Sequence, residues 1–150
     1  LVYLHNKCNV MKILVSRGLK ESDYDKMVEW GKFWRFPIPP KEFLPNDGLC
    51  GIAIVSGDGE DEEVLCTGLI YETNSKACWM EYIISNPQVR DKEVRTKALN
   101  FLIQSLVQVA KEWEYKWVFT SVKNQNLIKR YSDNGFVVGT QGTTEMLKVL

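Results

Sequence analysis

The fold is decided by residues 77–99, whose sequence is ACWMEYIISNPQVRDKEVRTKAL. Residues 77–85 are almost continuously apolar, which is typical of a central strand covered on both faces. The chain then turns polar, and further on apolar residues recur at helical spacing as far as Trp113. A buried strand that ends in a polar turn and opens a long helix indicates a mixed α/β fold.

The other expected elements extend this unit in both directions. Strands are predicted at residues 11–16, 48–56, 64–72, 116–121, 136–139 and 145–150, and helices at 21–32 and 125–134. Residues 33–40 are rich in aromatic residues and proline, so we expect a loop or a short helix there. The order of elements predicts a mixed α/β sheet.

Length and charge exclude several classes of protein. The chain has 150 residues, a length at which one domain is the default and the core needs no disulfide or metal. Its 19 basic and 19 acidic residues give a formal net charge of zero, which argues against broad neutralisation of nucleic-acid phosphates. No apolar run approaches the roughly 18 residues of a membrane span. We therefore expect neither a nucleic-acid nor a membrane partner.

The cysteines are spaced too widely for a metal site. They are Cys8, Cys50, Cys66 and Cys78. They form no C-x-x-C pair, and the chain has a single histidine, so the ligand spacing of a zinc site is missing. We expect free thiols, buried or half-buried in a cytoplasmic protein, and no metal.

The first ten residues are interpreted separately. Met11 is followed at once by an aliphatic strand pattern, so we interpret residues 1–10 as an extension upstream of a natural start and residues 11–150 as the single domain. The only histidine, His5, lies in this extension. We therefore expect no chemistry that depends on histidine.

The turn between the central strand and the long helix is a candidate anion site. A helix start leaves up to four backbone N–H groups unpaired and carries about half a positive charge, which suits a phosphate or pyrophosphate. The basic side chains around it are Arg90, Lys92, Arg95 and Lys97. In the alternative, Asn86 caps the helix with Pro87 as its first residue, and no such site forms.

A second motif follows the strand expected at residues 116–121. Asn124, Leu127, Tyr131, Gly135 and Phe136 match the pattern Asn-x-x-Ala-x-x-x-Tyr-x-x-x-Gly-Phe of the GNAT superfamily of N-acetyltransferases, with leucine in the alanine place. The chain resembles this family in element order as well. The resemblance implies a mixed, mostly antiparallel central sheet of six to seven strands with helices on both faces, and acetyl-CoA as the cofactor.

The resemblance also implies which residues hold acetyl-CoA. Pro87 and Arg90 match the start of the family's acyl-CoA loop. The strand backbone at Ile83, Ile84 and Ser85 would pair with the pantetheine arm. The polar break at Ser85 and Asn86 fits a bulge that separates this strand from the one expected at residues 116–121. The loop that would hold the pyrophosphate comprises Arg90, Asp91, Lys92, Glu93, Val94, Arg95 and Thr96.

This loop departs from the family pattern at two positions. Glu93 and Arg95 stand where the family has small residues that let the backbone approach the pyrophosphate. A carboxylate ~5 Å from a phosphate charge costs on the order of 3 kcal/mol at an effective dielectric constant of ~20. The side chains of Lys92 and Arg95 would offset this cost by binding the phosphates.

Family chemistry implies direct attack of an amine on the thioester, with no covalent enzyme intermediate. Tyr131 is the candidate acid for the leaving thiolate, and Glu81, the one carboxylate inside the apolar strand, is the candidate base. Glu72 and Glu145 are weaker candidates for the base. The structural alternatives are a tyrosine packed on the sheet and a glutamate that faces outward or forms a salt bridge.

Three aromatic residues and one asparagine complete the predicted site. Trp30, Trp34 and Phe36 would enclose an aliphatic or cationic amine, or else pack over the sheet. Asn124 would bond the pantetheine arm, or else cap the helix that follows it.

We therefore expect an acetyl-CoA-dependent N-acetyltransferase that acts on an amine of a small molecule or of a protein, as a monomer or a homodimer. One alternative is a catalytically inactive binding module with the same fold, favoured by the altered loop. The other is an acyltransferase with a different acyl group or a carrier protein as donor, whose acidic surface would meet the basic loop.

Overall fold

The computed structural model describes the backbone of residues 2–7, 10–57 and 59–150, and the side chains of residues 13–57 and 59–150. The strands are β1 (Val2–Lys7), β2 (Val10–Gly18), β3 (Gly51–Ser56), β4 (Glu63–Tyr71), β5 (Ala77–Ser85) and β6 (Trp117–Phe119). The α-helices are α1 (Glu21–Trp34), α2 (Lys92–Glu112) and α3 (Gln125–Asp133). Short 3₁₀ helices are η1 (Lys41–Phe43), η2 (Pro45–Gly48) and η3 (Gly59–Asp61). No helix in these ranges is long and apolar enough to cross a membrane.

One sheet runs through the described chain in the order β1-β2-β3-β4-β5-β6. Neighbouring strands are antiparallel except β5 and β6, which are parallel because α2 connects them by a crossover. The mixed, mostly antiparallel sheet is therefore confirmed. Five of the seven strands expected from the sequence form in it, each within about three residues of the predicted bounds.

The last two predicted strands are wrong. Residues 136–150 follow α3 without a helix or a strand, so neither 136–139 nor 145–150 pairs with the sheet. A strand forms only where a neighbour accepts its hydrogen bonds, and the apolar pattern of these residues supplies no such neighbour by itself. Conversely, β1 lies in the segment that we interpreted as an extension, and it pairs with β2. The predictions for the side chains of His5 and Cys8 fall outside the described ranges.

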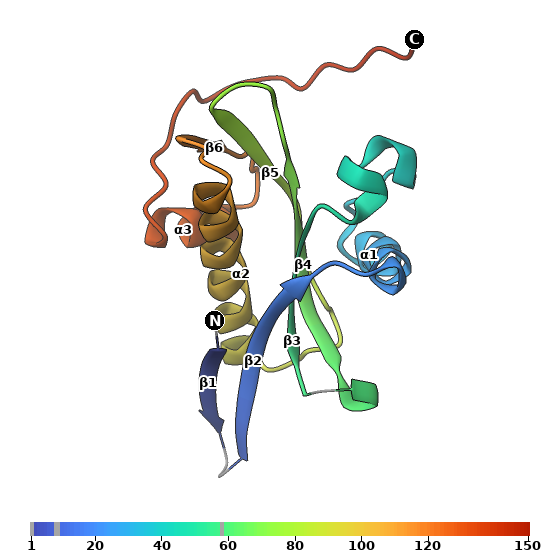
Figure 1. The fold of residues 1–150 in the computed structure, drawn as a ribbon, viewed down its shortest axis with the longest axis vertical. Helices are drawn as coiled ribbons and strands as arrows, with labels where there is room; N and C mark the ends of the chain where they lie inside the picture. Colours follow the sequence, from blue (N-terminus) through green and yellow to red (C-terminus); the bar gives the residue numbers. More distant parts are fainter. Residues whose placement is uncertain (1, 8–9, 58) are drawn as a thin grey trace.

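The sheet separates two hydrophobic layers (Figure 1). Successive residues of a strand point to opposite faces, so Ala53 and Val55 of β3 pack with α1, whereas Ile54 packs with α2. The layer under α1 comprises Leu19, Met27, Trp30, Leu44, Ala53, Val55, Val64, Leu69 and Ile84. The layer under α2 and α3 includes Leu14, Ile54, Leu65, Ile70, Met80, Val94, Ala98, Leu102, Leu106 and Tyr131. Helices on both faces are thus confirmed, and the helical spacing expected for α2 decides which of its residues are buried.

Gly68 of β4 lets α2 approach the sheet closely. A Cβ atom at Gly68 would lie 2.4 Å from Cδ1 of Ile83 and 2.9 Å from Cδ1 of Leu106. Both distances are shorter than the separation of two carbon atoms in van der Waals contact. Glycine, which has no Cβ atom, therefore fits at this position without displacing the side chains of β5 and α2.

A charged network fixes the start of α1. The guanidinium of Arg17 in β2 lies 2.7 Å from Asp23 and 2.7 Å from Glu62. Asp23 is 1% exposed and also accepts a hydrogen bond from the backbone N–H of Lys20 at 2.8 Å. Burial alone would raise the pKa of Asp23, but the hydrogen bonds from Arg17 and Lys20 hold it below its usual value. The network connects β2, α1 and the segment before β4.

The described thiols take part in no disulfide. Cys50 is half-buried, Cys66 and Cys78 are buried, and all three are free. Burial raises the pKa of each thiol, so these cysteines are poor nucleophiles at neutral pH. The cytoplasmic location that we expect from the thiols stays a prediction.

Candidate active site

Strands β5 and β6 part near the middle of the sheet. They pair at only three positions, from Ala77 with Trp117 to Trp79 with Phe119, whereas β5 continues to Ser85. Beyond Trp79 the edge of β5 therefore has no paired strand beside it, and we call the place where β5 and β6 part the gap. The separation of these two strands, which the sequence predicted, is confirmed.

The irregularity of β5 is a bulge at Tyr82 and Ile83, and we predicted it at Ser85 and Asn86. Leu69 of β4 pairs with Glu81 and Thr67 pairs with Ile84, so β5 holds one more residue than β4 over this stretch. Tyr82 adopts a φ of 53°, in the left-handed region that residues other than glycine rarely enter. Asn86 instead donates its N–H to the Leu65 carbonyl and extends the pairing with β4.

Tyr131 and Glu81 both lie near the point where the two strands part, since each contacts a residue that directly follows β6. Tyr131 comes from α3, is 3% exposed, and accepts a hydrogen bond from the Thr120 hydroxyl at 3.3 Å. Burial raises the pKa of Tyr131 to about 12, the Thr120 hydrogen bond lowers it in part, and the charge of Glu81 raises it further. The phenol is therefore protonated at neutral pH and close enough to Glu81 for their charges to interact.

Glu81 is the half-buried carboxylate of the site. Burial raises its pKa above the usual value, a hydrogen bond from the backbone of Ser121 lowers it, and the charge of Glu145 raises it again. A raised carboxylate pKa is the condition for a base that accepts a proton near neutral pH. Glu145, one of the weaker candidates, thus lies near Glu81, whereas the charge of Glu72 acts on the thiols of Cys50 and Cys78.

Two tyrosines that we did not predict surround Glu81. Tyr71 donates its hydroxyl to the Phe43 carbonyl at 3.1 Å, and burial followed by the charges of Tyr82 and Glu81 raises its pKa to about 12. The ring of Tyr82 contacts that of Phe36, with centroids 5.7 Å apart. Tyr71 could have been found from the sequence, since strand alternation places it two residues from the partner of Glu81; Tyr82 could not, because the bulge is not visible in the sequence.

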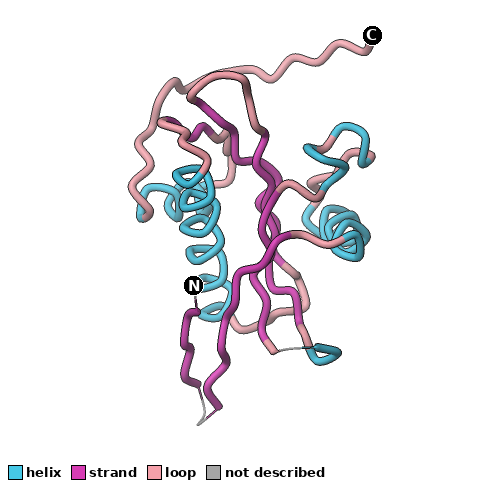
Figure 2. The backbone as a smooth tube through the Cα atoms, viewed as in Figure 1, coloured by secondary structure: helices cyan, strands magenta, loops and turns pink. Residues whose placement is uncertain are grey.

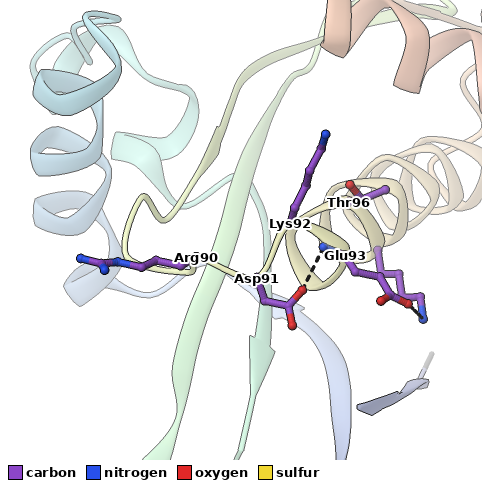
Figure 3. Close-up of a pocket in the computed structure, with 6 residues that line it drawn as sticks. Arg90, Asp91, Lys92, Glu93 and Thr96 are labelled. Atoms are coloured by element: carbon purple, nitrogen blue, oxygen red, sulfur yellow. Dashed lines mark hydrogen bonds and ion pairs between the residues drawn. The ribbon is translucent and has the colours of Figure 1, made fainter. Parts of the chain in front are cut away.

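The start of α2 is blocked by a carboxylate. Asp91 is the N-cap of the helix, and its side chain accepts from the N–H group of Glu93 at 3.0 Å (Figure 3) and from that of Val94 at 3.3 Å. These are N–H groups that we expected to hold a pyrophosphate. The prediction of an open anion site is wrong in this conformation, because aspartate is itself a strong N-cap. The alternative with Pro87 as the first helical residue is also wrong, since α2 begins at Lys92.

The charges around this helix start do not converge on one point. Arg90 and Lys92 extend in different directions from the loop, and Lys97 forms an ion pair with Glu93 at 3.1 Å (Figure 3). A hollow of about 600 Å³ is lined by Arg90, Asp91, Lys92, Glu93, Thr96 and Lys97. Val94 is buried in the core, and the Thr96 hydroxyl accepts from Arg130 of α3 at 2.9 Å. Two N–H groups of the helix start, those of Glu93 and Val94, are therefore closed to an anion here.

The remaining predicted residues divide into surface and core. Trp34 is exposed, and its indole Nε1–H donates to the Ser85 carbonyl at 2.7 Å. Phe36 is exposed beside Tyr82, but Trp30 is 5% exposed and packs in the layer under α1, so its predicted contact with the acceptor is wrong. Asn124 caps α3 by accepting from two backbone N–H groups, as in the alternative given for it.

Solved structures share this architecture. An acetyltransferase from Trypanosoma brucei superposes with a TM-score of 0.60 at 15% identity, over 89% of this chain and 99% of that one. Glucosamine-6-phosphate N-acetyltransferase from Arabidopsis thaliana gives 0.59 at 15% identity, over 90% of this chain and 99% of that one. N-acetylglutamate synthase from Neisseria gonorrhoeae, solved with coenzyme A and L-arginine, gives 0.64 at 13% identity, over 88% of this chain and 29% of that one.

The chain has the fold of the GNAT acetyltransferases. The fold expected from the Asn124–Phe136 motif is thereby confirmed. No protein-family profile matches the sequence. No curated protein matches it either.

The GNAT fold allows the fit of acetyl-CoA to be tested against the residues present. The edge of β5 beyond Trp79 has no paired strand, so an extended thioester arm could pair with it as a strand would. The start of α2, closed by Asp91, does not fit a diphosphate in this conformation. Among the described residues no group of three or more histidine, cysteine, aspartate or glutamate side chains is placed to hold a metal ion.

Proposed function

We propose that this protein is an N-acyltransferase that transfers an acetyl group from coenzyme A to an amine of a small molecule or a protein. The observation that carries the proposal is the meeting of Tyr131 and Glu81 at the gap where β5 and β6 part. Acetyl-CoA would supply a thioester whose carbonyl is open to attack by an amine.

Tyr131 is suited to the role of acid. Its phenol is buried, and it stays protonated because burial raises its pKa to about 12. Because the Thr120 hydroxyl donates to the phenol oxygen, the proton of the phenol itself can be donated to another group. A buried donor of this kind gives a proton to a leaving thiolate without competition from water.

Glu81 is suited to the role of base. Its carboxylate lies one residue before the bulge, and its raised pKa favours proton uptake from an ammonium group. Tyr71 and Tyr82 lie near enough for the charge of Glu81 to act on them, Phe36 contacts Tyr82, and these rings would attract a cationic amine. Direct attack would then need no histidine.

The blocked start of α2 favours a second candidate, in which the donor is a pantetheine thioester that lacks the nucleotide, as on a carrier protein. The gap would hold the arm in both cases. Only coenzyme A requires a diphosphate site, and Asp91 already occupies the N–H groups of Glu93 and Val94.

A donor comparison tests the proposal. Acetyl-CoA and acetyl-pantetheine are each incubated with a panel of aliphatic and aromatic amines, and release of the free thiol is followed. Transfer from acetyl-CoA at least ~100-fold more efficient than from acetyl-pantetheine supports the first candidate, since that ratio corresponds to roughly 2.7 kcal/mol of binding by the nucleotide part. Near-equal efficiency supports the second candidate. Absence of transfer and of binding with both donors would overturn the proposal and leave a binding module.

A substitution identifies the acid. Tyr131→Phe keeps the ring in the core and should lower turnover about 100-fold or more, with little change in donor affinity. Its control is Tyr115→Phe, which removes a phenol remote from the gap that bonds to Thr73. Unchanged turnover in Tyr131→Phe would remove this residue from the chemistry.

A further inference from the structure

Two consecutive side chains of β5 face the same side of the sheet. Glu81 pairs with Leu69, which lies in the layer under α1, and directly opposed residues of two antiparallel strands share a face. Tyr82 also packs against this layer, whereas Ile83 packs against the layer under α2. In a regular strand Tyr82 would face away from Glu81. The bulge therefore brings the ring of Tyr82 to the side of the sheet where the candidate base lies.

The backbone of Tyr82 is unfavourable for a residue that has a side chain. Its φ of 53° lies in the left-handed region, which glycine adopts without steric cost and tyrosine does not. Residues held in such a conformation cluster at binding and catalytic sites. A tyrosine at this position of the bulge therefore indicates a role for its ring that glycine could not fill.

The segment that follows α1 covers the same side of the sheet as α1 itself (Figure 2). It is held there by the indole N–H of Trp34, which donates to the Ser85 carbonyl at 2.7 Å, and by the contact between the rings of Phe36 and Tyr82. Trp34 and Phe36 are nevertheless 43% and 45% exposed. Rings that are fixed in place and still open to water can bind a ligand at little cost in side-chain entropy.

The carboxylate and the rings together favour an acceptor that carries a positive charge and an aromatic ring. The Glu81 carboxylate complements the charge of an ammonium group. Tyr82 and Phe36 offer planar apolar surfaces, against which another aromatic ring packs well. An amino sugar would instead turn hydroxyl groups toward these rings and lose hydrogen bonds to water. Because Glu81 and Tyr82 are neighbours in the chain, the charge and the ring of the acceptor are joined by a short linker.

We propose that the acceptor is an arylalkylamine, a primary amine joined by a short alkyl chain to an aromatic ring, with its ammonium group at Glu81 and its ring against Tyr82 and Phe36. Tyr82 is then the residue that determines specificity, because the bulge turns its ring toward the acceptor. This inference rests on the proposed function, to which it adds the class of the acceptor.

The experiment compares 2-phenylethylamine with 2-cyclohexylethylamine, which have the same skeleton and differ in the aromaticity of the ring. Transfer to each amine is measured as kcat/KM with acetyl-CoA and with acetyl-pantetheine, and binding of each amine without a donor is measured as Kd by calorimetry. Both measurements should favour 2-phenylethylamine about three- to tenfold, the range that contacts between aromatic rings provide. Glucosamine should be a poorer acceptor than either amine.

Substitutions test which rings cause the preference. Tyr82→Leu and Phe36→Leu should each raise the Kd of 2-phenylethylamine about three- to tenfold and leave that of 2-cyclohexylethylamine within about twofold. Tyr82→Phe keeps the ring and should keep the preference. Trp113→Leu is the control, because it removes an exposed ring at the end of α2, on the opposite side of the sheet. Because Phe36 is exposed, its variant tests the inference even where Tyr82→Leu fails to fold by circular dichroism.

The outcomes separate this inference from the proposed function. Acetyl transfer with equal efficiency to both amines, or a preference that survives Phe36→Leu and a folded Tyr82→Leu, would overturn the inference and leave the acyltransferase in place. Binding of 2-phenylethylamine that depends on Phe36, without transfer from either donor, would support the aromatic site and overturn the proposed function. Absence of both binding and transfer would overturn both.

Discussion

Replacing Asp91 by asparagine should tighten the binding of coenzyme A. The asparagine amide oxygen can accept the same two hydrogen bonds, from the N–H groups of Glu93 and Val94, so α2 stays capped. What disappears is the negative charge at the position that a diphosphate has to approach. Loss of the favourable interaction of that charge with the helix dipole should lower the free energy of unfolding by only ~0.3–1 kcal/mol.

The size of the gain in affinity follows from the distance between the charges. Two unit charges ~5 Å apart repel by about 0.8 kcal/mol in water and by about 3 kcal/mol at an effective dielectric constant of 20. Asp91 is half-exposed, so a value between these limits applies, and ~1.4 kcal/mol corresponds to a tenfold lower Kd. Isothermal titration calorimetry with coenzyme A measures the Kd, and thermal unfolding without ligand measures the cost of the change.

Two controls accompany this substitution. Asp133→Asn removes a carboxylate at the end of α3, where it pairs with Lys129, and should leave the Kd unchanged. Asp91→Ala removes the cap as well as the charge and should destabilise the fold by ~1 kcal/mol. A folded Asp91→Asn variant that binds coenzyme A no more tightly than the unchanged protein would refute the conclusion that this carboxylate blocks the helix start.

Three further predictions follow from contacts described above. Arg17→Met should lower the free energy of unfolding by roughly 3–5 kcal/mol at pH 7, because it leaves Asp23 buried without its partner. Hydrogen bonding to Arg17 lowers the pKa of Glu62 and, against the effect of burial, that of Asp23, so the stability from these bonds is present above about pH 4 and is lost as the pH falls below it. Urea unfolding should therefore show a smaller cost of the substitution at pH 3 than at pH 7. An equal cost at both pH values would contradict this reasoning. Leu102→Ala removes a fully buried side chain of α2 and should cost about 2–5 kcal/mol in urea unfolding, whereas a loss below about 1 kcal/mol would show that the layer under α2 collapses readily. Trp34→Phe keeps a ring but removes the N–H that occupies the Ser85 carbonyl, which we expect to pair with the pantetheine arm. The Kd for coenzyme A should therefore fall roughly three- to tenfold in calorimetry. A Kd that rises would indicate that Trp34 helps to hold the cofactor.

Patterns with a strong local cause could be predicted from the sequence. The bounds of β5 were predicted to the residue, because seven of its nine residues are apolar and polar turns stand on both sides of it. Capping of α3 was one of the two roles given for Asn124, and the asparagine does cap the helix, while Gly135 follows the helix at a φ of 85°. These features depend on the residues themselves and on their nearest neighbours along the chain.

Features that depend on distant partners could not be predicted in this way. The aliphatic pattern of residues 145–150 favours a strand, but a pattern cannot show whether an edge is within its reach. The bulge at Tyr82 arises from the register between β4 and β5, which neither strand encodes alone. Asp91 is predictable as an N-cap, since aspartate before a helical pattern is a capping signal, whereas the family pattern concerns only the glycines that are missing beside it.

Gly68 of β4 lies where the bulge of β5 packs against the core under α2. A methyl group at this position would collide with Ile83, the residue of the bulge that points toward α2, and with Leu106 of the helix itself. Either the two side chains would have to rotate in a packed interior or the strand would have to move, and a shift of Ile83 would be transmitted along the backbone to Glu81 two residues away. Exposed side chains of α2 can therefore be replaced one at a time with local effects. A single methyl group added at Gly68, in contrast, would move the candidate base Glu81 without contacting it.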